Sequence, residues 1–388
     1  MRMLSLYLQL ILFIMLTSSA LIGSEFLSSY NVVYLALLAL ALPIFIKRKF
    51  DIYFKMSHLI VTFTLILLSL MSSIKNEELT LFISNLALVL IFYIGYYFYN
   101  FIYKASVYKY DEFIKVALLI SLLMIWMIIK YPATNVVYRG IYENPNTMGV
   151  MLVTALILNI AIFFGLMESI LNKRIILINL LVSISFPIFF HLTLTLSRTS
   201  IIAYIVTFLL TYITYSIRAI YKGRLTSILK HTLFLILIIG IVIYYLPSDL
   251  LEPIQNKFEQ KSGDTLDLRG YIWATTIRDS GLLGQGSNYF DNTFILGAHN
   301  TFISLLGRYG YAYTIIILII WIWLGIKSFL YTIKSISNIY LYFPFTTWLG
   351  VSLLSMAEVM LFKPIMLVFF LSLALLTNKD FKTTIVKI

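Results

Sequence analysis

The chain has 388 residues, of which 61% are hydrophobic and only 12% are charged, whereas soluble domains carry about 25% charged residues. This composition predicts a polytopic membrane protein. The formal net charge of +12 does not indicate a nucleic-acid partner, because the basic residues are scattered over short polar segments, and the absence of cysteine excludes disulfides and cysteine-based metal sites.

Twelve apolar stretches follow one another, most of them roughly 20 residues long, which is the length that a transmembrane helix requires. They cover residues 3–23, 30–46, 56–74, 79–102, 113–131, 148–166, 174–196, 199–217, 230–246, 311–330, 339–357 and 360–377. Strands of a membrane barrel would instead alternate in polarity over about 10 residues. The sequence therefore predicts an all-α polytopic membrane protein with about 12 transmembrane helices, the first of them retained rather than removed as a signal peptide.

One apolar run, residues 175–217, contains Arg198 as its only charged residue. A single helix of this run would rise by about 1.5 Å per residue and would far exceed the ~30 Å apolar core of a bilayer. The run is therefore predicted to fold back on itself near Ser197 and Arg198.

Lys and Arg are unevenly divided between alternate loops, because 19 of the 29 fall on the side that holds both termini. The positive-inside rule places that side in the cytoplasm. The longest polar segment, residues 247–310 between spans 9 and 10, is then a large external loop. Because no internal repeat or low-complexity linker interrupts the chain, residues 1–388 are interpreted as a single membrane domain that contains this loop.

Three polar motifs fall on the predicted external face. The first is RGIYENPNTMG at 139–149, the second is TLSRTS at 195–200, and the third is the long loop itself. Within the loop, Arg269 lies on a predicted helix that Asp264 or Thr265 caps and that glycines after 280 end. The cytoplasmic loops carry only scattered Lys and Arg, so the active face is predicted to be external.

Arg198 carries the strongest functional prediction, since an arginine at membrane depth costs roughly 2.5 kcal/mol or more and is usually functional. Its forked donors suit a phosphate or diphosphate, and snorkelling towards the outer headgroups is the alternative. Arg269 is open to the same role or to pairing with a nearby aspartate. On the residues alone, Arg278 and Arg308 are more simply structural charges.

His299 is the only histidine of the long loop. A neutral imidazole, with an ordinary pKa of ~6.5, suits a general base, and a hydrogen bond to the backbone is the alternative role. Asp264 and Asp267 are spaced to bind a cation, but a solvated pair at a helix start is the simpler interpretation. No metal site is predicted.

Four pieces together resemble the O-antigen ligase and polysaccharide polymerase superfamily of bacterial envelope enzymes: GIYENPNTMG (140–149), TLSRTS (195–200), LRGYIWATTIRDSGLLGQG (268–286) and HNTFISLLGRYGYAY (299–313). The resemblance covers roughly 135–330 by motif and the rest by topology. It implies an inverting, metal-independent glycosyltransferase without a cofactor, located in the bacterial cytoplasmic membrane. Its donor would be an oligosaccharide on a polyprenyl diphosphate.

The resemblance also implies roles for individual residues. Arg198 and Arg269 match arginines that engage the diphosphate, and His299 matches the histidine that activates the acceptor hydroxyl. Further substrate-binding residues are expected at Arg139, Asn144, Asn146, Ser197, Arg278 and Asn300. The family spacing of His-Asn before a glycine is met by Gly310, whereas Tyr313 stands where the family often has glycine.

The sequence therefore predicts a polymerase that joins polyprenyl-diphosphate-linked repeat units to an acceptor glycan, with a flippase and a chain-length regulator as possible partners besides the lipid bilayer. A ligase that moves the glycan to lipid A–core or to protein is the alternative within the superfamily. A polysaccharide or lipid transporter is the alternative of another class. The clustering of informative polar residues on one outer face favours an enzyme, because transporters more often carry charges at the midplane and broken spans.

Overall fold

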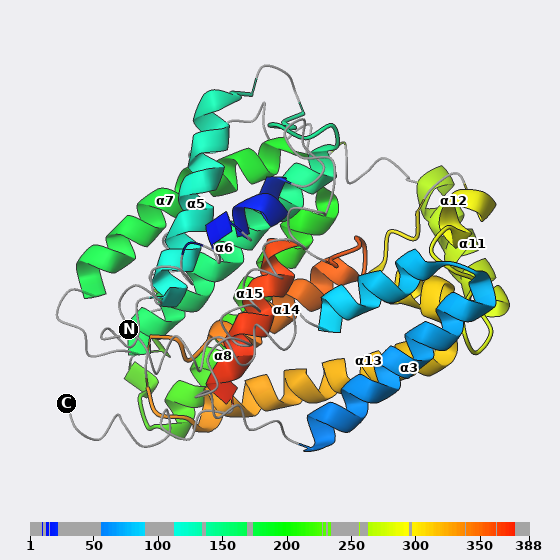
Figure 1. The fold of residues 1–388 in the computed structure, drawn as a ribbon. Helices are drawn as coiled ribbons and strands as arrows, with labels where there is room; N and C mark the ends of the chain where they lie inside the picture. The colour runs from blue at the N-terminus through cyan, green and yellow to red at the C-terminus, as the bar shows by residue number, and fades with distance from the viewer. Residues whose placement is uncertain are drawn as a thin grey trace. The chain divides into compact units, whose positions relative to one another are not determined.

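The computed structural model describes most, but not all, of the chain. It covers residues 10, 13–14, 16–21, 56–89, 112–133, 137–168, 174–226, 228–229, 232–233, 256, 263–294, 297–337, 339–361 and 363–376. Every regular element in these ranges is helical (Figure 1). Five of the helices are long and apolar enough to cross a membrane, which confirms the all-α membrane class for this part of the chain. The predicted spans at 30–46 and most of 230–246 lie outside it.

The chain separates into two compact units. Unit 1 comprises Met1–Asp111, Ser262–Lys327 and Val351–Phe381. Unit 2 comprises Glu112–Lys261, Ser328–Gly350 and Lys382–Ile388. The single domain that the sequence suggested stays a prediction.

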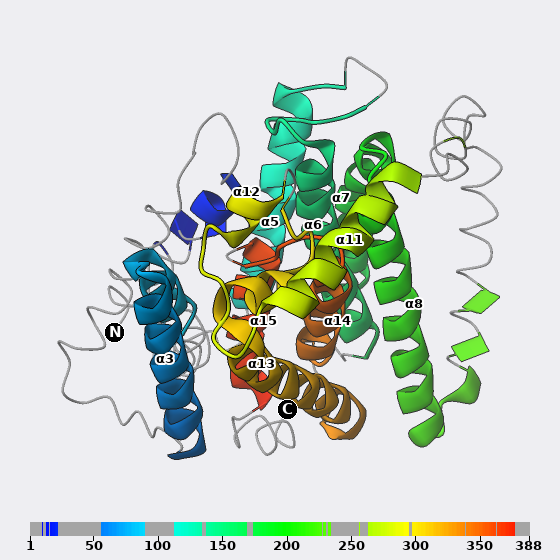
Figure 2. The ribbon, with the colours of Figure 1, turned by 90° about the vertical axis from the view of Figure 1, so that its right-hand side faces the viewer.

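The main helices of unit 1 come from the first and last thirds of the chain. They are α3 (Met56–Asn76), a short helix at Leu79–Val89, α11 (Gly263–Asp279), α12 (Tyr289–Thr293), the larger part of α13 (Thr301–Lys334), the end of α14 (Phe343–Ser355), and α15 (Pro364–Ser372) with a 3-10 turn at Leu373–Leu376. Figure 2 shows α11 in yellow-green and α12 in yellow. The predicted spans at 56–74, 311–330, 339–357 and 360–377 each coincide with a helix.

Helix α13 begins ten residues earlier than the predicted span at 311–330, because a first helical segment joins that span across a kink at Gly310, where φ is 83°. The end of the predicted external loop is therefore helical. Beyond the kink, Ile315, Ile319, Ile322 and Ile326 are all exposed and repeat every three or four residues. Such an unpartnered apolar stripe is typical of a helix face in contact with lipid.

The predicted loop helix is confirmed as α11, although its start differs from expectation. It begins at Gly263, so Asp264 and Thr265 lie inside the first turn and do not cap it. Its end agrees with the sequence, since Gly281, Gly284 and Gly286 all have positive φ. Short polar side chains are common both at the capping position and in the first turn of a helix. The sequence alone therefore did not fix where α11 begins.

Unit 2 is built around one buried helix. It contains α5 (Glu112–Lys130), α6 (Pro145–Glu168), α7 (Arg174–Leu194) and α8 (Arg198–Tyr221), and α6 contacts the other three (Figure 1). In its most apolar segment of 18 residues, 89% of the residues of α6 are buried, whereas the corresponding share for α7 is 17%. Since α6 is apolar on every side, burial on every side is its favoured environment.

Polar side chains fasten α6 to two of its neighbours. Asn159 donates to Ser185 of α7 at 3.0 Å and accepts from Ser121 of α5 at 3.2 Å. Asn159 is only 3% exposed, so water cannot reach its side-chain amide. The two hydrogen bonds from the neighbouring helices satisfy that amide instead. Interhelical hydrogen bonds of this kind contribute about 1 kcal/mol within a membrane bundle.

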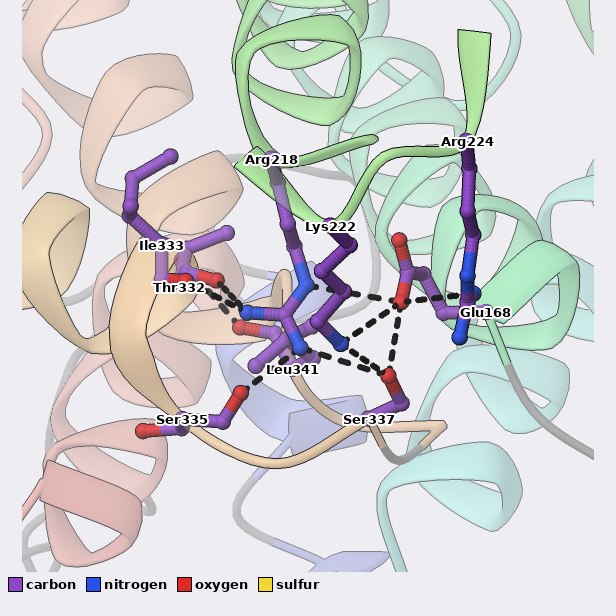
Figure 3. Close-up of polar contacts among 9 residues, drawn as sticks. All are labelled: Glu168, Arg218, Lys222, Arg224, Thr332, Ile333, Ser335, Ser337 and Leu341. Carbon is purple, nitrogen blue, oxygen red and sulfur yellow. Dashed lines mark hydrogen bonds and ion pairs between the residues drawn. The ribbon is translucent and has the colours of Figure 1, made fainter. Parts of the chain in front are cut away.

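The last turns of α6, α8 and α13 meet in a charged cluster inside unit 2 (Figure 3). Arg218 of α8 is fully buried and donates to three carbonyls near the end of α13: Thr332 and Ile333, both at 2.7 Å, and Ser335 at 2.6 Å. Its Nε lies 3.4 Å from the carboxylate of Glu168, the last residue of α6.

Two more cations approach the same carboxylate. Lys222 and Arg224 lie 3.5 and 3.8 Å from Oε2 of Glu168, and Ser337 donates to that oxygen at 2.8 Å. Three positive charges thus surround one carboxylate and three helix C-termini, each of which carries a partial negative charge of about half a unit. The charges nearly balance, and Arg218 satisfies carbonyls that have no partner within their own helix.

Burial and neighbouring positive charge act against the charged form of Lys222. Burial, followed by the nearby Arg218, lowers the pKa of the Lys222 ammonium, and Glu168 opposes this shift. The negative charge of Glu168 therefore offsets the repulsion among Arg218, Lys222 and Arg224.

Glu168→Gln should destabilise the protein by about 3–5 kcal/mol, because Arg218 would keep its buried charge and lose the compensating carboxylate. The measurement is denaturant unfolding of the purified protein in detergent, followed by tryptophan fluorescence. Glu143→Gln, at an exposed glutamate of the same unit, is the control and should change little. Equal midpoints for both variants would show that the cluster does not stabilise unit 2.

Candidate functional site

The first two motifs of the sequence come together in unit 2. A Cβ on Gly149, in the first turns of α6, would lie 2.8 Å from both Ser197 Cβ and Ser200 Oγ, so only glycine permits this approach. The N-termini of α6 and α8 therefore lie side by side. The predicted turn near Ser197 and Arg198 is confirmed, since α7 ends at Leu194 and α8 begins at Arg198.

The start of α6 is fixed by the asparagine motif. Asn144 Oδ1 accepts the backbone N–H of Asn146 at 2.8 Å, and the Asn144 carbonyl accepts that of Thr147 at 3.1 Å. This is the arrangement of a helix cap, so the Asn144 side chain has a local structural role, while Asn146 contributes only its backbone N–H. The preceding segment is tied to α7, because the Tyr138 N–H donates to the Leu194 carbonyl at 2.8 Å.

Arg198 occupies an electrostatically unfavourable position as the first residue of α8. A helix N-terminus carries partial positive charge and disfavours a cation by roughly 0.3–1 kcal/mol. Arg198 is half-buried and forms no ion pair with any residue that the structure describes, and the exposed Arg139 also lacks one among those residues. An anion placed at the start of α8 would be favoured by Arg198 and by the two adjacent helix ends. Ser197 points its hydroxyl to Ser200 at 2.9 Å instead of capping α8.

His299 and Glu358 form the most chemically suggestive pair of unit 1. His299 Nδ1 lies 3.6 Å from Glu358 Oε2, and about a quarter of each side chain is exposed. The φ of His299 is +46°, a left-handed conformation that non-glycine residues adopt rarely and mostly where surrounding structure enforces it.

Residues 300 and 301 enforce this conformation. Asn300 Oδ1 caps α13 by accepting the N–H groups of Phe302 and Ile303 at 2.9 and 3.1 Å, while Asn300 Nδ2 donates to the Met356 carbonyl. Thr301 donates to the Glu358 carbonyl at 2.9 Å. The predicted substrate-binding residue Asn300 thus holds His299 and Glu358 in register through local bonds.

Helix α11 is anchored beside His299. Ile272 packs in a core with Tyr289, Phe290 and Ala298, and Trp273 Nε1 donates to the Ala298 carbonyl at 2.8 Å. Arg269 precedes Trp273 by four residues and so lies on the same face of α11, one turn away. It is half-buried and has no ion pair among the described residues.

Arg278 has a different environment from Arg269. It is exposed and donates from Nε to the neighbouring Asp279 at 2.8 Å. This hydrogen bond and the charge of Arg278 lower the pKa of the Asp279 carboxyl. A solvated pair of this type contributes little to stability, and the substrate-binding role of Arg278 stays a prediction.

The glycine-rich loop 281–287 is paired with the kink of α13. Four backbone hydrogen bonds join the two segments: Gln285 N–H to Gly307 O at 2.7 Å, Gly286 to Arg308 at 3.3 Å, Tyr311 to Gly281 at 3.0 Å and Ala312 to Leu282 at 3.3 Å. A Cβ on Gly310 would collide with the Leu282 carbonyl. The kink therefore depends on glycine and on this pairing.

The end of α3 holds the other side of the same loop. Lys75 donates to the Gly284 carbonyl and Ser72 to the Leu283 carbonyl, both at 2.6 Å. Ser287 donates to the carboxylate of Glu78 from its backbone N–H and from its hydroxyl, the latter at 2.5 Å. Sequence reasoning missed Glu78 and also Glu358, because a lone carboxylate in a predicted loop carries no local signal of its distant partner.

The described residues contain no group of three His, Cys, Asp or Glu side chains that could hold a metal ion. The side chains of Asp264 and Asp267 lie outside the described part. The sequence matches no family model and no curated protein.

Gly310→Ala should destabilise the protein by about 1–3 kcal/mol, because alanine resists a positive φ and its methyl group would displace Leu282. Hydrogen exchange at the Gln285 and Gly286 amides should accelerate, since both bonds depend on the kink. Gly270→Ala on α11 is the control, as its Cβ would meet nothing within 4 Å. Unchanged amide protection in Gly310→Ala would contradict the proposed dependence.

Proposed function

We propose that this protein is a glycosyltransferase that extends a surface polysaccharide by joining polyprenyl-diphosphate-linked repeat units. The observation that carries the proposal is the His299–Glu358 pair, half-buried at the start of α13 and next to the anchored helix of Arg269. Arg198, at two adjacent helix N-termini and without an ion pair among the described residues, supports it from unit 2. The sequence resemblance gives the same assignment.

The chemistry is a single displacement. A sugar hydroxyl of the acceptor attacks the anomeric carbon of the donor, and the bond from that carbon to the diphosphate oxygen breaks. His299 takes the hydroxyl proton, and Glu358 orients the imidazole and stabilises the imidazolium that forms. The leaving polyprenyl diphosphate gains negative charge, which Arg269 in unit 1 stabilises. The same role is proposed for Arg198 from the geometry of unit 2 alone. One displacement inverts the anomeric configuration, and the good leaving group removes the need for a metal.

The proposal includes the topology. About twelve helices cross the bacterial cytoplasmic membrane, both termini are cytoplasmic, and residues 247–310 are external. The lipid tail of the donor then stays in the bilayer while its glycan meets the external face. A flippase would supply the donor from the cytoplasmic side, and a chain-length regulator would act on the growing product.

His299→Ala should lower turnover by about 10²–10⁴ while leaving donor binding intact, because a general base acts on the acceptor proton. Arg198→Lys should lose about 10²–10³ in rate, since lysine keeps the charge and loses the planar fork. The assay uses purified protein in nanodiscs, with a lipid-linked repeat unit as substrate and polymer length as readout.

Donor binding is measured separately on each variant, and Lys334→Gln serves as a control at an exposed cation. Loss of donor binding in His299→Ala together with full activity in Arg198→Lys would overturn the assigned roles. A ligase shares this chemistry and differs in its acceptor. Single transfer to lipid A–core or to protein, without chain growth, would therefore identify the ligase alternative.

Topology can be tested with single cysteines, because the chain contains none. Cysteine at the exposed positions Glu143 and Asp291 should react with an impermeant thiol reagent in intact cells, whereas cysteine at the exposed Thr226 should react only after permeabilisation. The opposite labelling pattern would place the candidate site on the cytoplasmic face and refute the proposal.

A further inference from the structure

Arg308 carries a buried donor atom without a partner among the described residues. Its Nε is inaccessible to solvent and forms no hydrogen bond, and its guanidinium forms no ion pair with any of those residues. The Nε of Arg218 also lacks a hydrogen bond, but it faces the Glu168 carboxylate at 3.4 Å, and the other nitrogens of Arg218 donate to three carbonyls. An unpaired buried donor costs free energy in the folded protein, so the Nε of Arg308 does not contribute to folding stability.

The position of Arg308 on α13 relates it to the His299 end of the helix. It follows Thr301 by seven residues, which is almost two full turns, so the two lie on the same face. Thr301 is bound on that face to the segment after α14, through the Glu358 carbonyl and the Met360 N–H, both at 2.9 Å. Because helix side chains lean towards the N-terminus, this spacing is expected to carry the guanidinium towards the end of α13 where His299 lies.

The backbone of Arg308 is held on two sides. Its carbonyl accepts the Gly286 N–H at 3.3 Å and the Ser72 hydroxyl at 3.2 Å. The next residue, Tyr309, is buried and donates to the Leu81 carbonyl at 3.0 Å. A side chain presented from a fixed backbone binds a ligand without the cost of ordering that backbone.

We propose that Arg308 binds an oxyanion of the substrate beside the His299–Glu358 pair, and that the missing partner of its guanidinium is this ligand. The inference rests on the proposed function only in taking the ligand to be a lipid-linked glycan. Two groups of such a molecule have the required chemistry: the diphosphate of the donor and the carboxylate of an acidic sugar. Both can accept two parallel hydrogen bonds from one arginine.

The test compares wild type, Arg308→Gln and Arg308→Lys as purified full-length protein in nanodiscs. Inorganic pyrophosphate probes the diphosphate, and glucuronate, with glucose as the neutral reference, probes an acidic sugar. Lys327→Gln is the matched control, because Lys327 is a cation of the same helix that lies over the ring of Trp323 at 3.6 Å.

Arg308→Gln should weaken the binding of one probe by about 10-fold or more, which is the usual effect of losing a charge-assisted hydrogen bond. Arg308→Lys should recover only part of this loss, since lysine cannot bind bidentately. Lys327→Gln should bind like the wild type. The affected probe identifies the ligand group, either pyrophosphate or glucuronate.

Thermal unfolding without ligand gives an independent readout. A binding arginine without internal partners should be removable at no loss of stability, so Arg308→Gln should melt at or above the wild-type temperature. A lower melting temperature with unchanged binding of both probes would overturn the proposal and make Arg308 structural.

The inference and the proposed function can fail separately. Pyrophosphate binding that depends on Arg308 in a protein that makes no polymer would keep the inference and reject the polymerase. Polymer synthesis with wild-type kinetics and unchanged probe binding in both Arg308 variants would support the polymerase and reject the inference about Arg308.

Discussion

Backbone polar groups in a membrane protein must find partners inside the protein, because lipid offers none. This constraint accounts for the two best-organised junctions of the chain. In unit 2, the side chain of Arg218 satisfies carbonyls that the end of α13 leaves free. In unit 1, the kink at Gly310 frees the carbonyls of residues 307 and 308, and the amides of the glycine-rich loop bind them. The free carbonyls are therefore bound by an arginine side chain in unit 2 and by backbone amides of a loop in unit 1.

The same two junctions separate cations that stabilise the fold from cations available to a ligand. Arg218, Lys222 and Arg224 face a carboxylate and helix C-termini, where positive charge is favoured. Arg198 stands at a helix N-terminus, where positive charge is disfavoured, and Arg308 keeps a donor unused among the described residues. Residues placed against their own electrostatic preference are expected at functional sites, since stability and function make different demands there.

The sequence predicted what depends on local composition. Apolar length located most helices, and the solitary charge of Arg198 located the turn between α7 and α8 correctly. The glycines after residue 280 marked the end of α11, although its start was misplaced, because Asp264 and Thr265 suit a cap and a first turn equally well. The kinked start of α13 was missed because residues 301–309 were assigned to the polar loop.

The candidate site was only partly predictable for a related reason. The motifs named His299 and the arginines, but Glu358, the partner of His299, lies far along the chain and belongs to none of the motifs. Periodicity and motif spacing report neighbours within a few turns, whereas such pairs are created by tertiary packing. The roles of Arg218 and Glu78 could not be predicted either, because their partners are also distant in the sequence.

The buried carboxylate of Glu168 has a consequence for the order in which the protein is made. Its hydrogen-bond partner Ser337 follows 169 residues later in the chain. At a synthesis rate of about 5–20 residues per second, that interval lasts roughly 10–30 s. During most of it, α6 and the cations Arg218, Lys222 and Arg224 have already been translated, while the end of α13 that bonds to Arg218 and Glu168 is still missing. The charged cluster is therefore completed late in synthesis, after α5, α6, α7 and α8 have all been made.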